Sequence, residues 1–180
     1  MKNEIRIVLL PPDDIVEAAV ELSARIADTF DTAFTLSATD IAPHITLIKL
    51  ESGKSISEMH KAVSEVISKV QPVDAVFSSI DGALGWVGAN IVSPAILDIR
   101  GALEHIARER CFMFGSRDYV PHLTFSRLKD FENTQLKTEL FDYVRTHWQH
   151  TTPFTMNRIA IGPNAPHGTF PLIRATVFSL

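Results

Sequence analysis

One order of apolar patterns occurs twice along this chain. In each copy, a short β-rich run is followed by a helical pattern, a second β-rich run, a second helical pattern and a third β-rich run. Pro72 follows the second helical pattern of the first copy, and Pro153 takes the same place in the second. Because the two copies present the same series of apolar faces, they predict two similar lobes related by a pseudo-twofold axis.

Strands are expected at residues 5–10, 41–50, 73–80, 86–92, 119–128, 154–161 and 169–178. Helices are expected between them, starting at Asp13 or Asp14, at Ser55 or Ser57, and at Pro94, with a fourth before Pro153. These patterns predict an α+β fold of bilobal shape, in which antiparallel sheets line a central cleft and the helices lie outside. We expect one domain over residues 1–180, with lobe-like halves at approximately 1–82 and 83–180.

Composition limits the partners and the setting of the protein. The 180 residues carry a formal net charge of −4, so a broad electrostatic grip on duplex nucleic acid is not expected. The single cysteine, Cys111, excludes an intramolecular disulfide and is expected to be a buried small hydrophobe. The apolar run at the N-terminus is broken by Pro11 and Pro12, so it predicts neither a signal peptide nor a membrane anchor. We therefore expect a cytoplasmic protein, as a monomer, without a membrane partner.

The strongest motif occupies the same place in both copies of the repeat. Residues 43–50 read PHITLIKL, and residues 121–128 read PHLTFSRL. Both segments follow the pattern Pro-His-apolar-Thr-apolar-x-basic-Leu. A single His-x-Thr is a weak signal, because such short patterns recur by chance. Two matched octets at equivalent points of a repeat indicate a shared function, since packing alone does not require the whole pattern twice.

Strand geometry gives the spacing a physical meaning. Residues i and i+2 of a strand project from the same face. His44 and Thr46 therefore project together, while Ile45 points to the opposite face and into the core. His122 and Thr124 form the equivalent pair. The pseudo-twofold axis is expected to place both His-Thr pairs around one cleft.

Two histidines and two threonines suit phosphoryl transfer at a diester. One imidazole can take a proton from water while the other gives a proton to the leaving oxygen, because histidine ionises near neutral pH. The threonine hydroxyls can donate hydrogen bonds to the phosphate oxygens on which charge develops. Such a site needs neither a metal ion nor a cofactor. The alternative for either copy alone is a hydrogen-bonded structural histidine beside an ordinary strand threonine.

The paired His-x-Thr strands resemble the two-histidine (2H) phosphoesterase superfamily. The opening strand that ends in Leu-Pro and the closing Phe-Pro-Leu-Ile-Arg segment extend the resemblance over nearly the whole chain. The superfamily includes RNA 2′,3′-cyclic phosphodiesterases (also called 2′-5′ RNA ligases), plant-type cyclic nucleotide phosphodiesterases and 2′,5′-oligoadenylate phosphodiesterases. The resemblance implies that His44 and His122 are catalytic and that Thr46 and Thr124 bind phosphate. It also implies a bilobal fold with a central groove, and catalysis without metal.

The resemblance favours hydrolysis of a 2′,3′-cyclic phosphate at an RNA end or on a nucleotide, with a 2′-phosphate as the product. The motifs leave other substrates open, namely 2′-5′ linked oligonucleotides, cyclic oligonucleotides and an ADP-ribose cyclic phosphate, and they leave 2′-5′ ligation open as the reverse reaction. They do not say which histidine is the acid. A non-catalytic nucleotide-binding module and a zinc hydrolase are two further alternatives. Both are disfavoured, since both motifs are intact and no third metal ligand is evident.

Several other residues are weaker candidates. Arg127 is a candidate phosphate ligand, although strict alternation places it, like Lys49, on the face opposite the histidines unless a bulge intervenes. The remaining candidates for the cleft are two strand cations and two aromatic side chains that could stack on a base: Arg6, Arg174, Tyr119 and Phe170. A third His-x-Thr begins at His167, in a segment of turn composition, and is expected to border the cleft without being catalytic.

Overall fold

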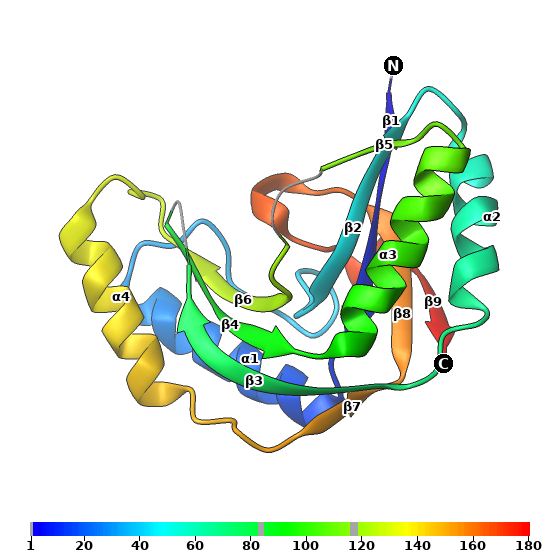
Figure 1. The fold of residues 1–180 in the computed structure, drawn as a ribbon. Helices are drawn as coiled ribbons and strands as arrows, with labels where there is room; N and C mark the ends of the chain where they lie inside the picture. Colours follow the sequence, from blue (N-terminus) through cyan, green and yellow to red (C-terminus); the bar gives the residue numbers. More distant parts are fainter. Residues whose placement is uncertain (1, 83–84, 116–118) are drawn as a thin grey trace.

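A computed structural model gives the structure of the chain and describes residues 2–82, 85–115 and 119–180. This described part forms four α-helices and nine strands of one curled sheet (Figure 1). The helices are α1 (Asp13–Thr29), α2 (Ile56–Ile67), α3 (Pro94–Glu109) and α4 (Thr134–His147). The strands are β1 (Asn3–Leu10), β2 (Ile45–Ser52), β3 (Val73–Asp81), β4 (Trp86–Val92), β5 (Met113–Phe114), β6 (His122–Arg127), β7 (Phe154–Met156), β8 (Arg158–Pro163) and β9 (Thr176–Ser179).

The order of the strands carries the pseudo-twofold relation. Across the sheet the order is β7-β3-β4-β6-β2-β1-β8-β9. The short strand β5 lies outside this order and pairs with β2. Going outward from β2, the strands are β1, β8 and β9; going outward from β6, they are β4, β3 and β7. Helices α2 and α3 pack on β1 and β2, while α1 and α4 pack on β6, β4 and β3. The predicted α+β class, with two related lobes and external helices, is confirmed.

The two copies of the repeat exchange elements. The third strand of the first copy, β3, pairs with β4 of the second copy, and β8 of the second copy pairs with β1 of the first. The first helix of each copy also packs on the central strand of the other, α1 on β6 and α3 on β2. A boundary near residue 82 therefore separates the two copies of the repeat, but each lobe takes elements from both halves of the sequence.

Some boundaries differ from those that the sequence predicted. The expected strand at 154–161 is interrupted at Asn157 and forms β7 and β8, which belong to opposite ends of the sheet. Within the expected strand at 169–178, Leu172–Arg174 forms a short 3₁₀ turn and only the end belongs to β9, while another 3₁₀ turn, Pro166–Gly168, lies just before this segment. Pro171 lacks the N–H that a strand ladder uses, which favours the turn. Strands β2 and β6 also begin later than expected, at Ile45 and His122.

Helix ends show which capping signals were correct. Ser55 caps α2 in a capping box with Glu58, as its sequence suggested. Asp13 and Asp14 instead lie inside the first turn of α1, after Pro12. Their negative charges there interact favourably with the partial positive charge at the N-terminus of the helix. The prediction that Cys111 is buried is wrong. Cys111 is exposed with φ 59°, because it takes the left-handed position that ends α3 in a Schellman motif.

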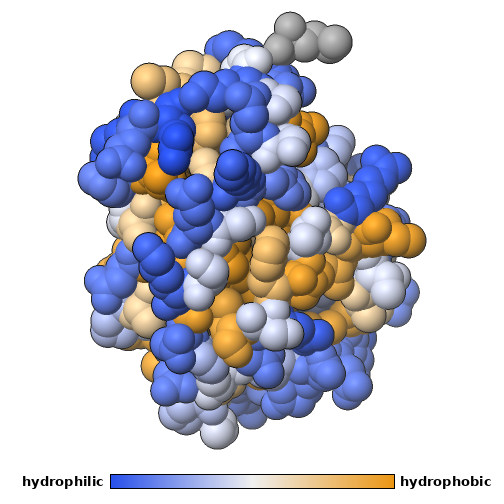
Figure 2. All heavy atoms as spheres, turned by 90° about the vertical axis from the view of Figure 1, so that its right-hand side faces the viewer, coloured by the Kyte–Doolittle hydropathy of each residue, from blue (hydrophilic) through white to orange (hydrophobic). Residues whose placement is uncertain are grey.

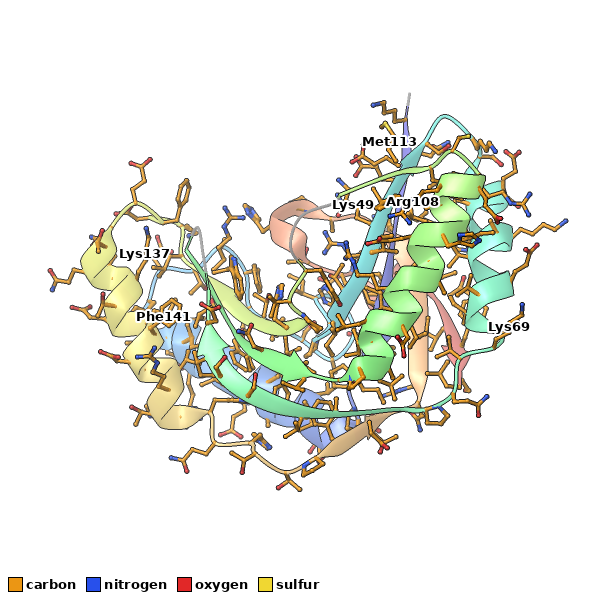
Figure 3. All side chains as sticks on the ribbon, viewed as in Figure 1. Lys49, Lys69, Arg108, Met113, Lys137 and Phe141 are labelled. Atoms are coloured by element: carbon orange, nitrogen blue, oxygen red, sulfur yellow. The ribbon has the colours of Figure 1, made fainter. Side chains whose placement is uncertain are left out.

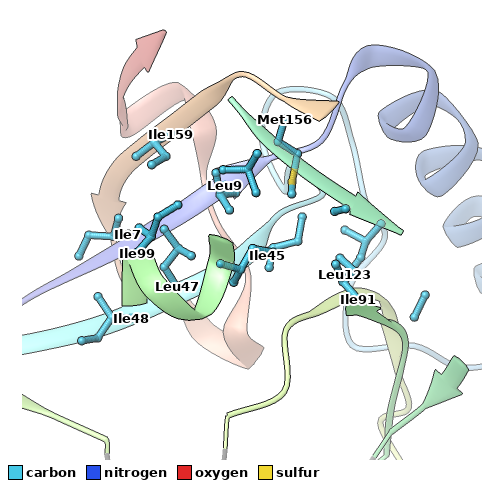
Figure 4. Close-up of a cluster of buried hydrophobic side chains, with 14 of the residues drawn as sticks. Ile7, Leu9, Ile45, Leu47, Ile48, Ile91, Ile99, Leu123, Met156 and Ile159 are labelled. Atoms are coloured by element: carbon cyan, nitrogen blue, oxygen red, sulfur yellow. The ribbon is translucent and has the colours of Figure 1, made fainter. Parts of the chain in front are cut away.

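The strand residues that face away from the cleft pack with helix residues in the hydrophobic core (Figure 4). Ile45, Leu47 and Leu123 are fully buried, as the alternation of the motif strands predicts. Leu9 and Ile159 of the neighbouring strands lie in the same cluster. The buried face of each motif strand is thus packed in the core, which fixes the direction of the side chains on the opposite face.

The side of the molecule that bears α2 and β9 carries an apolar patch amid hydrophilic side chains (Figure 2). Ile173 and Val177 are exposed near β9, and an apolar groove lies between α2 and α3. In the order of the sheet, β9 is separated from the nearer motif strand, β2, by β1 and β8. Within the described ranges, every helix is too short or too polar for a bilayer crossing.

Candidate active site

The two motif strands meet at one point and then diverge. The sheet register between β2 and β6 contains a single pair, Ile45 opposite Leu123, beside the two histidines. Beyond this pair the strands separate, and a cleft of about 390 Å³ opens between them. His44 and His122 line this cleft, and so do the threonines two residues after each of them. The predicted convergence of two His-Thr pairs is therefore observed.

The two histidines have the same hydrogen-bonding geometry. Nδ1 of His44 lies 2.8 Å from the carbonyl oxygen of Ala42, and Nδ1 of His122 lies 2.8 Å from that of Val120. A carbonyl only accepts, so Nδ1 carries the proton and donates it in both rings. This tautomer leaves Nε2 as the basic nitrogen of a neutral ring. The same hydrogen bond holds the ring orientation that proton transfer requires.

A β-bulge in β6 brings Arg127 to the cleft. Between one pair and the next, β4 advances by one residue, from Gly88 to Val87, while β6 advances by two, from Thr124 to Ser126. The extra residue shifts the alternation, so Arg127 returns to the face of Thr124 and lines the cleft. Strict alternation, which would place Arg127 on the opposite face, is wrong here because of the bulge.

Strand β2 has a bulge at the equivalent place. β1 advances from Val8 to Ile7, while β2 advances from Thr46 to Ile48. Lys49 therefore also reaches the cleft, and its position on β2 can be followed in Figure 3. The eight-residue motif thus contains a His, a Thr and a basic residue on one face, with a bulge before the basic residue.

A side chain of α3 and one from the segment before β6 donate hydrogen bonds to the backbone of β2 at its bulge. The hydroxyl of Tyr119 donates to the Thr46 carbonyl at 2.7 Å, and Arg100 donates to the Leu47 carbonyl at 2.8 Å. The Arg100 guanidinium lies 4.1 Å from the centre of the Tyr119 ring and pairs with Glu104. Burial raises the pKa of Tyr119, which keeps its hydroxyl a donor. Tyr119 thus supports the strand and is not an open platform for a base.

Arg100→Met is expected to destabilise the protein by about 2 kcal/mol, because the buried Leu47 carbonyl loses a charged donor. It should also lower kcat/KM, since the bulge sets the direction of Thr46 and Lys49. Urea denaturation and initial rates measure the two effects. Arg108→Met is the matched control, because Arg108 also pairs with Glu104 but is exposed on α3. Equal effects of the two substitutions would contradict this role of Arg100.

Cations dominate the cleft. Arg6, Lys49, Arg100 and Arg127 line it, and none of the described lining residues is a carboxylate. Lys49 is neutralised by Glu4 and Glu51, each at 3.1 Å. In the described part of the chain, Arg127 has no carboxylate partner and lies 5.7 Å from the ring centre of Phe131. Arg127 is therefore the lining cation that remains available to an anionic ligand.

Arg6 fixes the loop that covers one end of the cleft. Its guanidinium is buried and donates to the Gly168 carbonyl and to Asn164. His167 and Gly168 line the cleft, both with left-handed backbone (φ 57° and 80°). The expectation that this loop borders the cleft is thus correct.

The remaining weak candidates lie elsewhere. Phe170 is fully buried and packs against the His44 ring, at 5.4 Å between ring centres. It therefore offers no open surface for stacking on a base. Arg174 is exposed and does not line the cleft.

Trp86, at the start of β4, is a site residue that the sequence analysis missed. Its indole lies against the imidazole of His122, with ring centres 4.5 Å apart and planes 21° from parallel. Trp86 faces Arg127 across the β4–β6 pair. No local motif marks this residue, because its role depends on which strand pairs with β6. Among the described residues, no cluster of three or more His, Cys, Asp or Glu side chains is placed to bind a metal ion.

The surroundings of His44 favour its neutral form. Burial is the largest cause and, together with the charges of Arg6 and His122, lowers the pKa of His44 from 6.5 to about 4 against the opposing effects of the Ala42 and Gly168 carbonyls. The ring is thus neutral at physiological pH and can accept a proton at Nε2.

This lowered pKa predicts a pH dependence of stability. Unfolding restores the ordinary pKa of His44, so the unfolded state binds a proton more readily as the pH falls below 6.5. We expect a loss of about 3 kcal/mol of stability from this group between pH 6.5 and pH 4. Urea denaturation of wild type and His44→Gln across this range measures it, with His105→Gln, on the exposed face of α3, as the control. A slope unchanged in His44→Gln would contradict the prediction.

Comparisons with known proteins agree with this geometry. The family model described as the 2′-5′ RNA ligase superfamily matches residues 11–162. Escherichia coli LigT complexed with 3′-AMP is similar in structure, with a TM-score of 0.65 and 14% identity over 100% of this chain and 96% of that chain. Kluyveromyces marxianus Usb1 has a TM-score of 0.55 and 12% identity over 99% of this chain and 98% of that chain. No curated protein matches in sequence. The family match spans most of the chain, and the protein therefore belongs to the 2′-5′ RNA ligase superfamily of two-histidine phosphoesterases.

Proposed function

We propose that the protein is a metal-independent phosphodiesterase that hydrolyses the 2′,3′-cyclic phosphate of an RNA end or a nucleotide. The observation that carries this proposal is the pair of equivalent histidines at one cleft, each with Nδ1 bonded to a carbonyl two residues before it. This arrangement supplies two proton-transfer groups on opposite sides of one bound phosphate. An acid on one side and a base on the other are what opening a cyclic diester requires.

In this mechanism water attacks the phosphorus, and Nε2 of one histidine takes a proton from the water. The bond between phosphorus and the ribose O3′ breaks, and the other histidine gives its proton to O3′. The products are a 2′-phosphate and a free 3′-hydroxyl. Thr46 and Thr124 donate hydrogen bonds to the non-bridging oxygens, and Arg127 offsets their charge. The residues of the cleft thus supply base, acid and anion stabilisation without a cofactor.

The relatives and the charge of the cleft support a nucleotide substrate. Structures of E. coli LigT contain 3′-AMP, ATP or NADP⁺. The described residues that line the cleft include no carboxylate, and together with the available Arg127 they favour an anionic ligand over a neutral one. We further propose that the protein acts as a monomer and in the cytoplasm, and its single cysteine supports the compartment.

Phosphorus NMR tests the proposal directly. A 2′,3′-cyclic mononucleotide and a short RNA with a cyclic phosphate end are incubated with the protein in EDTA. The expected result is a new phosphomonoester signal with the chemical shift of a 2′-phosphate, which is absent with the His44→Ala or His122→Ala variant. No turnover of either substrate would overturn the proposal and direct the same assay to 2′-5′ linked, cyclic and ADP-ribose cyclic phosphate substrates. Turnover that EDTA abolishes would contradict independence from metal.

A further inference from the structure

Phe131, in the segment between β6 and α4, lies next to the cleft without lining it. The Arg127 guanidinium, which does line the cleft, lies 5.7 Å from the centre of the Phe131 ring. Among the described residues, Phe131 is the one phenylalanine, tyrosine or tryptophan that is exposed, with 40% of its surface accessible. An open aromatic ring therefore adjoins the cation that is available to an anionic ligand.

The turn before β4 fixes the backbone of Phe131. Gly85 has a left-handed φ of 81°, and a Cβ at Gly85 would lie 2.3 Å from the Cβ of Phe131. The Leu128 amide donates to the Gly85 carbonyl at 2.9 Å. The segment that carries Phe131 is thus held against the residue that directly precedes Trp86, which lines the cleft.

The other aromatic side chains at the cleft are already engaged. One face of Trp86 is covered by the imidazole of His122. Tyr119 donates to the backbone of β2, and Phe170 is fully buried. A nucleobase stacks on an open aromatic face, and it does so without regard to sequence because every base has a π-face. Phe131 is therefore the ring at this cleft that is best exposed for a base.

The size of the cleft suits a single nucleotide. Its volume of about 390 Å³ is near the lower end of the roughly 300–1,000 Å³ that pockets for small ligands span. The terminal nucleotide with its cyclic phosphate would occupy this space. A base on Phe131, which lies outside the lining of the cleft, therefore belongs to the nucleotide before the terminal one.

The charges around Phe131 suit an uncharged group. Asp130 and Glu132 flank it in the chain, and both are exposed. The intervening cation, Lys129, is paired with Asp31 at 2.7 Å. Two carboxylates oppose a phosphate at Phe131 itself, whereas a base carries no charge. The phosphates of the substrate are thus expected to remain with the cations of the cleft, while a base extends over the ring.

Resting on the proposed function, we propose that Phe131 is a substrate-binding residue that stacks on the base of the nucleotide preceding the cyclic phosphate end. The protein then prefers an RNA end of at least two nucleotides to a cyclic mononucleotide. The preference is for the presence of a second base and not for its identity, because stacking does not read the edges of a base.

The ratio of kcat/KM for a dinucleotide with a cyclic phosphate end to kcat/KM for the cyclic mononucleotide measures this preference. In the wild type, the ratio is expected to be roughly 10. Phe131→Ala should lower it to about 1, while the Cβ that packs against Gly85 is kept. Phe131→Tyr, which keeps the ring, should preserve the ratio. A dinucleotide whose first nucleotide lacks its base should show no advantage over the mononucleotide with either the wild type or Phe131→Ala.

Phe141→Ala is the matched control. Phe141, on α4, also lies beside an arginine, with the Arg145 guanidinium 5.9 Å from its ring centre (Figure 3). It does not line the cleft, and its ring is not exposed. The control should keep the wild-type ratio.

The outcomes separate this inference from the proposed function. A ratio that ignores Phe131→Ala, or an equal loss for both substrates in this variant, would overturn the inference even if the enzyme opens cyclic phosphates. Calorimetric Kd values for the corresponding mononucleotide and dinucleotide 2′-phosphates give the same comparison without turnover. A preference for the dinucleotide in Kd that Phe131→Ala removes would support the stacking role of Phe131, and it would do so even if neither cyclic phosphate is opened and the proposed reaction is rejected.

Discussion

Replacing either His44 or His122 by alanine is expected to lower kcat for a 2′,3′-cyclic nucleotide by about 10³-fold, because each variant loses one of the two proton-transfer groups. The double variant should be little slower than either single one, since the two groups act together in one step. Initial rates at saturating substrate measure the effect. KM should change less than kcat, because the threonines and Arg127 remain to bind the phosphate.

His60→Ala provides the control, since His60 lies on α2 and does not line the cleft. It should retain the wild-type rate. A single histidine variant that keeps more than about a tenth of the wild-type kcat would contradict the two-histidine mechanism, because one general acid or base contributes about a hundredfold or more. Circular dichroism of each variant shows whether a lost rate reflects chemistry or unfolding.

Gly88→Val is expected to destabilise the protein by at least about 4 kcal/mol, because a side chain at this position has no space. A Cβ at Gly88 would lie 2.4 Å from the Leu123 carbonyl oxygen and 3.1 Å from the Cα of Thr124. Both contacts are with the backbone of β6 at the bulge, so no side-chain rotation relieves them. The strand would have to move, and with it the direction of Thr124 and Arg127.

Urea denaturation and kcat/KM of the folded fraction measure the two consequences of this clash. Gly53→Val is the matched control, because a Cβ at Gly53 meets nothing within 4 Å. The control should stay within about 0.5 kcal/mol of the wild type. A Gly88→Val protein as stable as this control would show that β4 and β6 do not approach as closely as the structure indicates.

The period of two residues in a strand predicted the reacting groups but not their supports. His44 and Thr46 follow strict alternation, because the bulge comes only after them. The face of Lys49 and Arg127 stayed open, because a bulge depends on the register with the adjacent strand, which one strand's sequence does not contain. Trp86 was missed for the same reason, since its position beside His122 follows from the pairing of β4 with β6.

Exchange between the copies of the repeat is likewise a property of the assembled sheet. The pattern of each copy predicted the fold class and most helices and strands. It did not predict that β3 and β8 would cross to the other lobe, because apolar strands of similar length can pair in several orders. Cys111 shows the converse case, in which an apolar neighbourhood suggested burial while a helix end required a left-handed residue at the surface.

The single pair between Ile45 and Leu123 is the point from which β2 and β6 diverge. When the angle between β2 and β6 changes, each pair of facing residues separates in proportion to its distance from this point. His44 and His122 are the immediate neighbours of this point in the chain, so their separation changes least. Lys49 and Arg127 lie four residues farther along their strands, so the mouth of the cleft widens most. The separation of the two histidines is thus set beside the pair, whereas the separation of the two basic residues depends on the angle between the strands.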